Sequence, residues 1–247
     1  MKYKNIIFDF DETLIETRKC KRILFEYVSN RYLPELDYKT FNRNFLDVIR
    51  EELAKYEGEQ FMTYGFGLDD VFFNKDIGEY LKTDGKELKH RLLKEAVERT
   101  GGEYDYDIAE KLIKDLEDNW VQGYTVYEGV YELLNELKRR GGNIYGLTNG
   151  FSVLQNKKVE HCRYGHWFDK IYISEDFGVG KPDKSIFEII LKENDLKKEE
   201  TVMIGDNYEK DIMPAKEMGL HNIHIGKSDG GAESIEELSE ILLEEEQ

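Results

Sequence analysis

Near its amino end the sequence reads Asn5-Ile6-Ile7-Phe8-Asp9-Phe10-Asp11-Glu12-Thr13-Leu14. The short apolar run from Asn5 to Phe8 is typical of a buried strand in a parallel sheet, and two acidic residues follow it directly. In open parallel sheets, ligands bind beyond the carboxyl ends of the strands. Asp9 and Asp11 are therefore predicted to lie at the ligand-binding edge of a sheet.

The pattern after about Val121 alternates between amphipathic helices and short apolar runs. These runs predict four further strands, at Asn143–Leu147, Ile171–Ile173, Thr201–Ile204 and Ile223–Ile225. Strands that alternate with helices favour a parallel sheet covered by helices on both faces. The predicted fold class is thus α/β, with a Rossmann-like parallel sheet as its core.

Between the first strand and Val121 the sequence reads almost wholly as helix. The apolar positions of four successive helices are Ile23, Leu24, Tyr27 and Val28; Phe41, Phe45, Val48, Ile49, Leu53 and Tyr56; Leu88, Leu92 and Ala96; and Ile108, Leu112, Ile113, Leu116 and Trp120. Four amphipathic helices in a row resemble a small bundle. We expect an α/β core of residues 1–16 and 122–247, with an all-helical domain of residues 17–121 inserted after the first strand.

Composition excludes several classes of function. The 247 residues include 35 Lys and Arg against 52 Asp and Glu, a net charge of −17, which disfavours a nucleic-acid polymer as partner. Two cysteines are too few for a disulfide scaffold or a thiolate metal cage. No apolar run is long enough to cross a bilayer or to form a signal peptide, so we expect a cytoplasmic protein without a membrane partner.

Polar residues follow most of the predicted strands, and these residues should converge on one edge of the sheet. They are Asp9 and Asp11, Thr148 and Asn149, Lys181, and Asp206 and Asp211. Crowded carboxylates raise one another's pKa unless a cation lies between them. Oxygen ligands of this kind suit Mg²⁺, which is usually shared with substrate phosphate. The predicted cofactor is therefore Mg²⁺.

The same set contains the groups that phosphoryl transfer requires. A lysine and a threonine hydroxyl supply the positive charge and the donor that phosphoryl oxygens need. One carboxylate can attack phosphorus to form an aspartyl-phosphate, and a second, two residues on, can exchange protons with the leaving group and water. The residues thus indicate a phosphoryl-transfer enzyme.

Four short segments resemble the motifs of the haloacid dehalogenase-like (HAD) hydrolase superfamily. They are Asp9-Phe10-Asp11-Glu12-Thr13-Leu14, Leu147-Thr148-Asn149-Gly150, the lysine of Gly178-Val179-Gly180-Lys181-Pro182, and Gly205-Asp206-Asn207-Tyr208-Glu209-Lys210-Asp211. One motif alone would be weak evidence, but four in order, each after a predicted strand, make a specific match. The helical insertion resembles the family's cap domain, placed between the first two motifs.

The resemblance implies a role for each matching residue. Asp9 would be the nucleophile and Asp11 the general acid and base. Thr148, the backbone N–H of Asn149 and Lys181 would bind phosphoryl oxygens, with Thr148 and Lys181 counted as catalytic. Mg²⁺ would be held by Asp9, the backbone carbonyl of Asp11 and Asp206, while Asp211 would lie behind these ligands, as an outer ligand or an orienter of Lys181.

The expected function is Mg²⁺-dependent hydrolysis of a small phosphomonoester through an aspartyl-phosphate. Thr148-Asn149-Gly150-Phe151 followed by Gln155 resembles the 5′-nucleotidase branch, which favours a nucleoside 5′-monophosphate as substrate. A base could then stack on aromatic residues of the insertion. Three alternatives stay open: a sugar phosphomutase, a 2-haloacid dehalogenase, which would need no acid at Asp11, and a binding protein without turnover.

Overall fold

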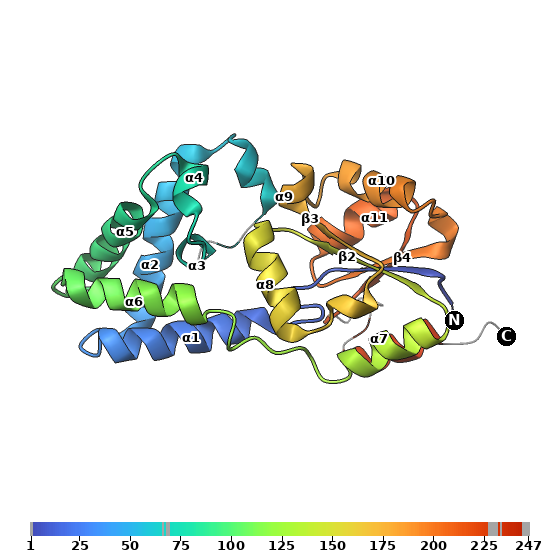
Figure 1. Cartoon of the computed structure of the whole chain (residues 1–247), viewed down its shortest axis with the longest axis horizontal. Coiled ribbons are helices and arrows are strands. Elements are labelled where there is room, and N and C mark those ends of the chain that lie inside the picture. Colours follow the sequence, from blue (N-terminus) through green and yellow to red (C-terminus); the bar gives the residue numbers. More distant parts are fainter. Residues whose placement is uncertain (1, 66, 68–69, 227–231, 233, 244–247) are drawn as a thin grey trace. The chain divides into compact units, whose positions relative to one another are not determined.

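The computed structural model describes residues 2–65, 67, 70–226, 232 and 234–243 (Figure 1). The chain divides into two compact units. The core unit comprises Met1–Thr17, Thr63–Gly65 and Thr125–Gln247, and the helical unit comprises Arg18–Met62 and Phe66–Tyr124. That these units are the predicted core and cap domains, with boundaries at residues 16, 17, 121 and 122, stays a prediction.

The core unit contains one parallel sheet of five strands, which confirms the predicted fold class. The strands are β1 (Asn5–Phe8), β2 (Asn143–Thr148), β3 (Lys170–Ile173), β4 (Thr201–Gly205) and β5 (His221–His224). Their order is β3-β2-β1-β4-β5, so β1 lies at the centre. Phe8 pairs with Gly146 of β2 and Ile204 of β4, which brings the carboxyl ends of three strands together.

Helices cover both faces of this sheet, as Figure 1 shows for α10 and α11 on one side and α7 on the other. The helices of the core unit are α7 (Val130–Arg139), α8 (Ser152–Cys162), α9 (Ser174–Phe177), α10 (Lys184–Glu193), α11 (Met213–Glu217) and α12 (Ile235–Leu243). A π-helical turn, Tyr208–Ile212, precedes α11. Buried strand residues such as Ile7, Leu147 and Met203 pack with Phe187 and Ile190 of α10. A continuous apolar layer thus forms on that face.

Phe10 explains why an apolar residue separates the two acidic residues after β1. Its side chain is fully buried and packs edge-on against the rings of Tyr164 and Phe168. A Cβ on Gly146 would collide with the Phe10 ring, so β2 needs glycine at that point. This packing anchors the segment that carries Asp9 and Asp11 to the sheet.

The helical unit is built around a cluster of aromatic side chains. Its helices are α1 (Thr17–Tyr32, with Thr17 in the core unit), α2 (Tyr38–Leu53), α3 (Asp70–Phe73), α4 (Ile77–Leu81), α5 (Gly85–Arg99) and α6 (Tyr106–Asn119). Asp37 caps α2 by accepting a hydrogen bond from the Thr40 backbone N–H at 2.9 Å.

Across the described parts of both units, no helix combines the length and the apolar character that a membrane span requires.

Two aromatic residues of the insertion, Phe72 and Phe73, are packing residues, whereas Tyr64 is half-buried, so stacking of a base on aromatic residues of the insertion stays a prediction. Phe72 and Phe73 are fully buried, with the Phe72 ring centroid 4.7 Å from that of Phe45 and Phe73 stacked on Trp120 at 5.4 Å. Phe66 and the side chain of Phe61, from the same aromatic stretch of the sequence, lie outside the described residues.

The predicted apolar face of the first helix is wrong in part. Ile23 and Tyr27 of α1 are 53% and 60% exposed, whereas Phe25 and Val28 are buried. The rings of Phe45 and Phe73 lie 5.2 and 5.7 Å from that of Phe25. These contacts decide which of two apolar stripes on α1 turns inward.

Candidate active site

A buried lysine lies between two aspartates at the carboxyl end of the sheet. Lys181 Nζ is 2.7 Å from Asp9 Oδ1 and 2.6 Å from Asp211 Oδ1. The lysine side chain is 3% exposed, that of Asp9 11% and that of Asp211 fully buried. Three residues from three different predicted motifs thus share one ion-paired cluster.

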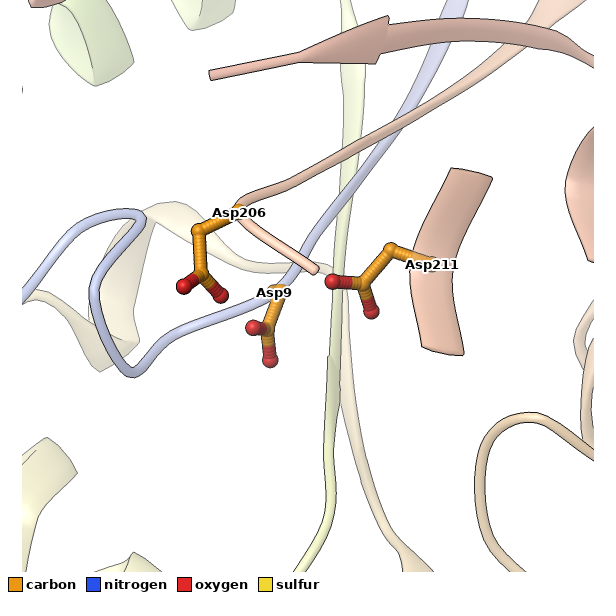
Figure 2. Close-up of side chains that lie close together, drawn as sticks. All are labelled: Asp9, Asp206 and Asp211. Carbon is orange, nitrogen blue, oxygen red and sulfur yellow. The ribbon is translucent and has the colours of Figure 1, made fainter. Parts of the chain in front are cut away.

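Asp206 completes a group of three carboxylates (Figure 2). One carboxylate oxygen from each of Asp9, Asp206 and Asp211 lies within 4.8 Å of the other two. Asp9 follows β1 and Asp206 follows β4, so the pairing of these neighbouring strands positions both residues. Figure 2 shows the carboxylates of Asp9 and Asp206 directed toward the same space, with Asp211 reaching in from the turn before α11.

The electrostatics of this cluster favour an added positive charge. The pKa of Asp9 is raised to about 7: burial is the largest cause, Asp211 and Asp11 add to it, and Lys181 opposes it. Burial alone would lower the pKa of Lys181, yet Asp211 and Asp9 raise it above its ordinary value. The lysine therefore stays charged, and one ammonium does not neutralise the carboxylates around it. A divalent cation among these oxygen ligands would do so.

Local backbone structure brings Asp211 close to the strand end. Its Oδ2 accepts a hydrogen bond from the Asn207 backbone N–H at 3.0 Å, and its own N–H donates to the Asn207 carbonyl at 2.8 Å. A Cβ on Gly205 would collide with the Asp211 carboxylate, so only glycine permits this approach. Both carboxylate oxygens of Asp211 therefore already contact the protein.

Thr148 and Asn149 follow β2 in the same region of the core unit. The Thr148 hydroxyl is buried and finds no hydrogen-bond partner among the described residues. A buried hydroxyl without a partner is costly unless a ligand supplies one. The Asn149 side chain, by contrast, is paired with the backbone of Lys181. Its Nδ2 donates to the Lys181 carbonyl at 2.7 Å, and its Oδ1 accepts from the Lys181 N–H at 2.9 Å.

Asp11 lies next to residues that the sequence reasoning did not assign to the site. Lys158 Nζ on α8 is 2.9 and 2.8 Å from the two carboxylate oxygens of Asp11. Gln155 Nε2 donates to the Asn149 carbonyl at 2.8 Å and lies 3.4 Å from Asp11 Oδ2. Gln155 is part of the resemblance to the 5′-nucleotidase branch, but no sequence signal marks Lys158, because a lysine within a helix is usually solvated.

The core unit thus brings together Asp9, Lys181, Asp206 and Asp211, places Asn149 on the backbone of Lys181, and joins Asp11 to α8. The carboxylate oxygens and the raised pKa of Asp9 fit a hard divalent cation such as Mg²⁺. The roles assigned to these residues, including metal binding by the Asp11 carbonyl and phosphoryl binding by Thr148, stay predictions.

Comparison with known proteins gives relatives that act on phosphorylated compounds. A family model described as haloacid dehalogenase-like hydrolase matches residues 3–219. Glyceraldehyde 3-phosphate phosphatase of Methanocaldococcus jannaschii is 30% identical over 222 residues, covering 85% of this chain and 95% of that protein. Pyrimidine 5′-nucleotidase YjjG of Escherichia coli is 37% identical over 97 residues, covering 39% of this chain and 43% of that protein.

Comparison with solved structures shows which known fold the chain shares. The crystal structure of the HAD-hydrolase YfnB from Bacillus subtilis bound to magnesium matches with a TM-score of 0.68 and 19% identity. The match covers 98% of this chain and 99% of that one. At this level of identity, the likeness shows a shared fold.

Proposed function

We propose, because the chain belongs to the haloacid dehalogenase-like hydrolases, that it is a Mg²⁺-dependent phosphatase acting on a small phosphomonoester. The observation that carries the proposal is the position of Lys181 between Asp9 and Asp211, with Asp206 in the same group of carboxylates. This arrangement offers a nucleophile, a fixed positive charge and metal ligands within a few ångströms of one another. Phosphoryl transfer depends mainly on such positioning and charge neutralisation.

In the first step, an Asp9 carboxylate oxygen attacks phosphorus while the bond to the leaving-group oxygen breaks. Asp11 gives its proton to that oxygen, and an aspartyl-phosphate forms on Asp9. Lys181 neutralises negative charge on Asp9 and on the transferring group. Thr148 donates its unpartnered hydroxyl to a phosphoryl oxygen, together with the backbone N–H of Asn149.

In the second step, Asp11 takes a proton from water as the water oxygen bonds to phosphorus and the bond between phosphorus and Asp9 breaks. Asp9, Asp206 and the Asp11 carbonyl would hold Mg²⁺, which supplies Lewis-acid stabilisation of charge on the phosphoryl oxygens. Asp211 orients Lys181 from behind, since both of its carboxylate oxygens contact the protein.

The substrate we propose is a small phosphorylated metabolite such as a triose phosphate or a nucleoside 5′-monophosphate. The similarity to the glyceraldehyde 3-phosphate phosphatase supports the first, and the similarity to the 5′-nucleotidase over 97 residues supports the second. The helical unit would serve as the cap that determines substrate choice. A nucleic-acid polymer is not an expected partner, because the net charge is −17, and a membrane is not expected, because no apolar run is long enough to cross one.

Release of inorganic phosphate from a panel of nucleotides, sugar phosphates and triose phosphates, with Mg²⁺ or with a chelator, tests the proposal. We expect phosphate release that the chelator abolishes. Conversion of a hexose 1-phosphate into an isomer would instead indicate a phosphomutase, and chelator-resistant activity on a haloacid a dehalogenase. Absence of turnover on every ester would leave the chain a binding protein and contradict the proposal.

A further inference from the structure

Lys158 is a nearly buried cation that contacts the proposed acid-base residue, Asp11. Its side chain is 2% exposed, whereas that of Asp11 is 32% exposed. Its Nζ contacts Asp11 Oδ1 at 2.9 Å and Oδ2 at 2.8 Å, so the ammonium bridges both oxygens. The buried end of the pair lies on α8, and its more accessible end is the carboxylate.

Gln155 supports the same carboxylate from one turn earlier in the helix. Residues three apart lie on one face of a helix, so the Gln155 amide and the Lys158 ammonium point in the same direction. The amide is fixed by its hydrogen bond to the Asn149 carbonyl at 2.8 Å, and its Nε2 lies 3.4 Å from Asp11 Oδ2. A rigid helix thus presents two donors to Asp11, whereas Asp11 itself lies in the segment after β1.

Burying an ammonium is strongly unfavourable unless a carboxylate pairs with it. A helix that only needed to cover the sheet would carry an apolar residue at this position. The buried ammonium of Lys158 is therefore explained by its contact with the carboxyl group of Asp11. A carboxyl group that must give up a proton and then accept one has to keep a fixed place in both protonation states.

We propose that Lys158, with Gln155, is a positioning residue that fixes the carboxyl group of Asp11 for proton transfer. The inference rests on the proposed phosphatase function. When Asp11 carries its proton, one oxygen still accepts a hydrogen bond from Lys158 while the other holds the proton for the leaving-group oxygen. After that proton has passed to the leaving group, the same contact holds the carboxylate that takes a proton from water.

Leaving-group dependence separates this role from a general structural one. An alkyl phosphate needs protonation of its leaving oxygen, whereas p-nitrophenyl phosphate expels a stable phenolate and needs little. Because kcat/KM reports only the steps up to phosphoenzyme formation, later proton abstraction from water does not affect it. We expect Lys158→Met to lower kcat/KM for an alkyl phosphomonoester by about tenfold or more, and that for p-nitrophenyl phosphate by less than about threefold.

The matched control is Lys157→Met, which removes a more accessible lysine from the same helix and should change neither value. In an Asp11→Asn background, Lys158→Met should cause no further loss of kcat/KM for the alkyl phosphomonoester, because the proton-transfer group that it positions is already gone. Circular dichroism and thermal melts report folding. Should Lys158→Met fail to fold, Gln155→Leu carries the same test, with a smaller loss confined to the alkyl ester.

Equal losses on both esters, no loss on either, or full additivity with Asp11→Asn would overturn the inference while leaving the phosphatase function intact. Absence of turnover by the wild-type protein on every phosphomonoester would overturn the proposed function, and this inference with it.

Discussion

The side chain of Asn149 forms a two-point hydrogen bond with the backbone of Lys181. Its Nδ2 donates to the Lys181 carbonyl at 2.7 Å, and its Oδ1 accepts from the Lys181 N–H at 2.9 Å. An amide is suited to this because it offers a donor and an acceptor side by side. The loop after β2 thereby fixes the loop that carries the lysine, and so the place of the ammonium between Asp9 and Asp211.

Asn149→Ala should therefore destabilise the core unit and lower activity together. The loss of two hydrogen bonds is expected to reduce the free energy of unfolding by about 1–3 kcal/mol, measured by urea denaturation. Asn156→Ala, at an exposed position of α8, is the control and should leave both quantities unchanged. Wild-type stability in Asn149→Ala would show that the paired hydrogen bonds do not hold the lysine loop.

Asp9→Asn should abolish phosphate release and preserve the fold, since it removes the nucleophile at nearly constant volume. Phosphate release and a circular dichroism spectrum measure the two effects. Asp195→Asn serves as control, because Asp195 is exposed and asparagine tolerates its positive φ of 50°. Retention of most of the activity in Asp9→Asn would contradict the assigned role.

Asp11→Asn should also impair turnover strongly, but at a different point. Without a group to take a proton from water, the aspartyl-phosphate is expected to break down slowly and accumulate. Rapid quenching after mixing with a ³²P-labelled substrate would measure the labelled protein. Equal labelling of Asp11→Asn and wild type would argue against a base at this position.

Gly205→Ala should displace the Asp211 carboxylate, because the added Cβ would collide with it. Overpacking of this kind should lower the free energy of unfolding by about 1–3 kcal/mol. It would also move Asp211 away from the Lys181 ammonium. Thermal denaturation and kcat measure the two effects. Gly123→Ala is the control, since a Cβ there meets no atom within 4 Å; equal behaviour of the two variants would contradict the prediction.

In the metal-free protein, Asp9 should contribute to the free energy of unfolding, and this contribution should decrease as the pH rises. The pKa of Asp9 is raised from 3.8 to about 7, so the folded protein binds this proton more tightly than the unfolded chain. The stabilisation is complete below about pH 3.8 and is lost as the pH rises through about 7. Asp9→Asn should lack this component in denaturation measured across that range.

Mg²⁺ should stabilise the protein more at about pH 8 than at about pH 5.5, because the cation binds only the deprotonated carboxylate. Thermal midpoints with and without Mg²⁺ measure the difference. Asp206→Asn, which removes a proposed ligand, should reduce the shift. A shift of equal size at both pH values would indicate that Asp9 is not part of the metal site.

The sheet could be predicted from sequence because buried parallel strands read as uninterrupted apolar runs. The run at Ile223–Ile225 gave the strand but not its bounds, since β5 begins at His221, an exposed residue without an apolar signal. The buried face of α1 was not predictable, because Ile23 and Phe25 are both apolar and only contacts with Phe45 and Phe73 decide between them.

Some residues of the site could be predicted from the sequence, and others could not. Asp9, Thr148 and Asp206 could be located because each stands at or just after the end of a strand. Lys158 could not, since its contact with Asp11 joins residues 147 apart in the chain. Nothing in the local sequence distinguishes this lysine from a solvated one on a helix surface.

The hydroxyl of Thr148, the amide of Asn149 and the ammonium of Lys158 all come from one short peptide. Each residue added to a helix rotates everything after it by about 100°. A single insertion before Gln155 would leave Thr148 in place yet turn Lys158 away from Asp11. Substitutions at exposed positions such as Val153 and Asn156 should therefore leave the site intact, whereas an insertion or deletion within this peptide should disrupt it.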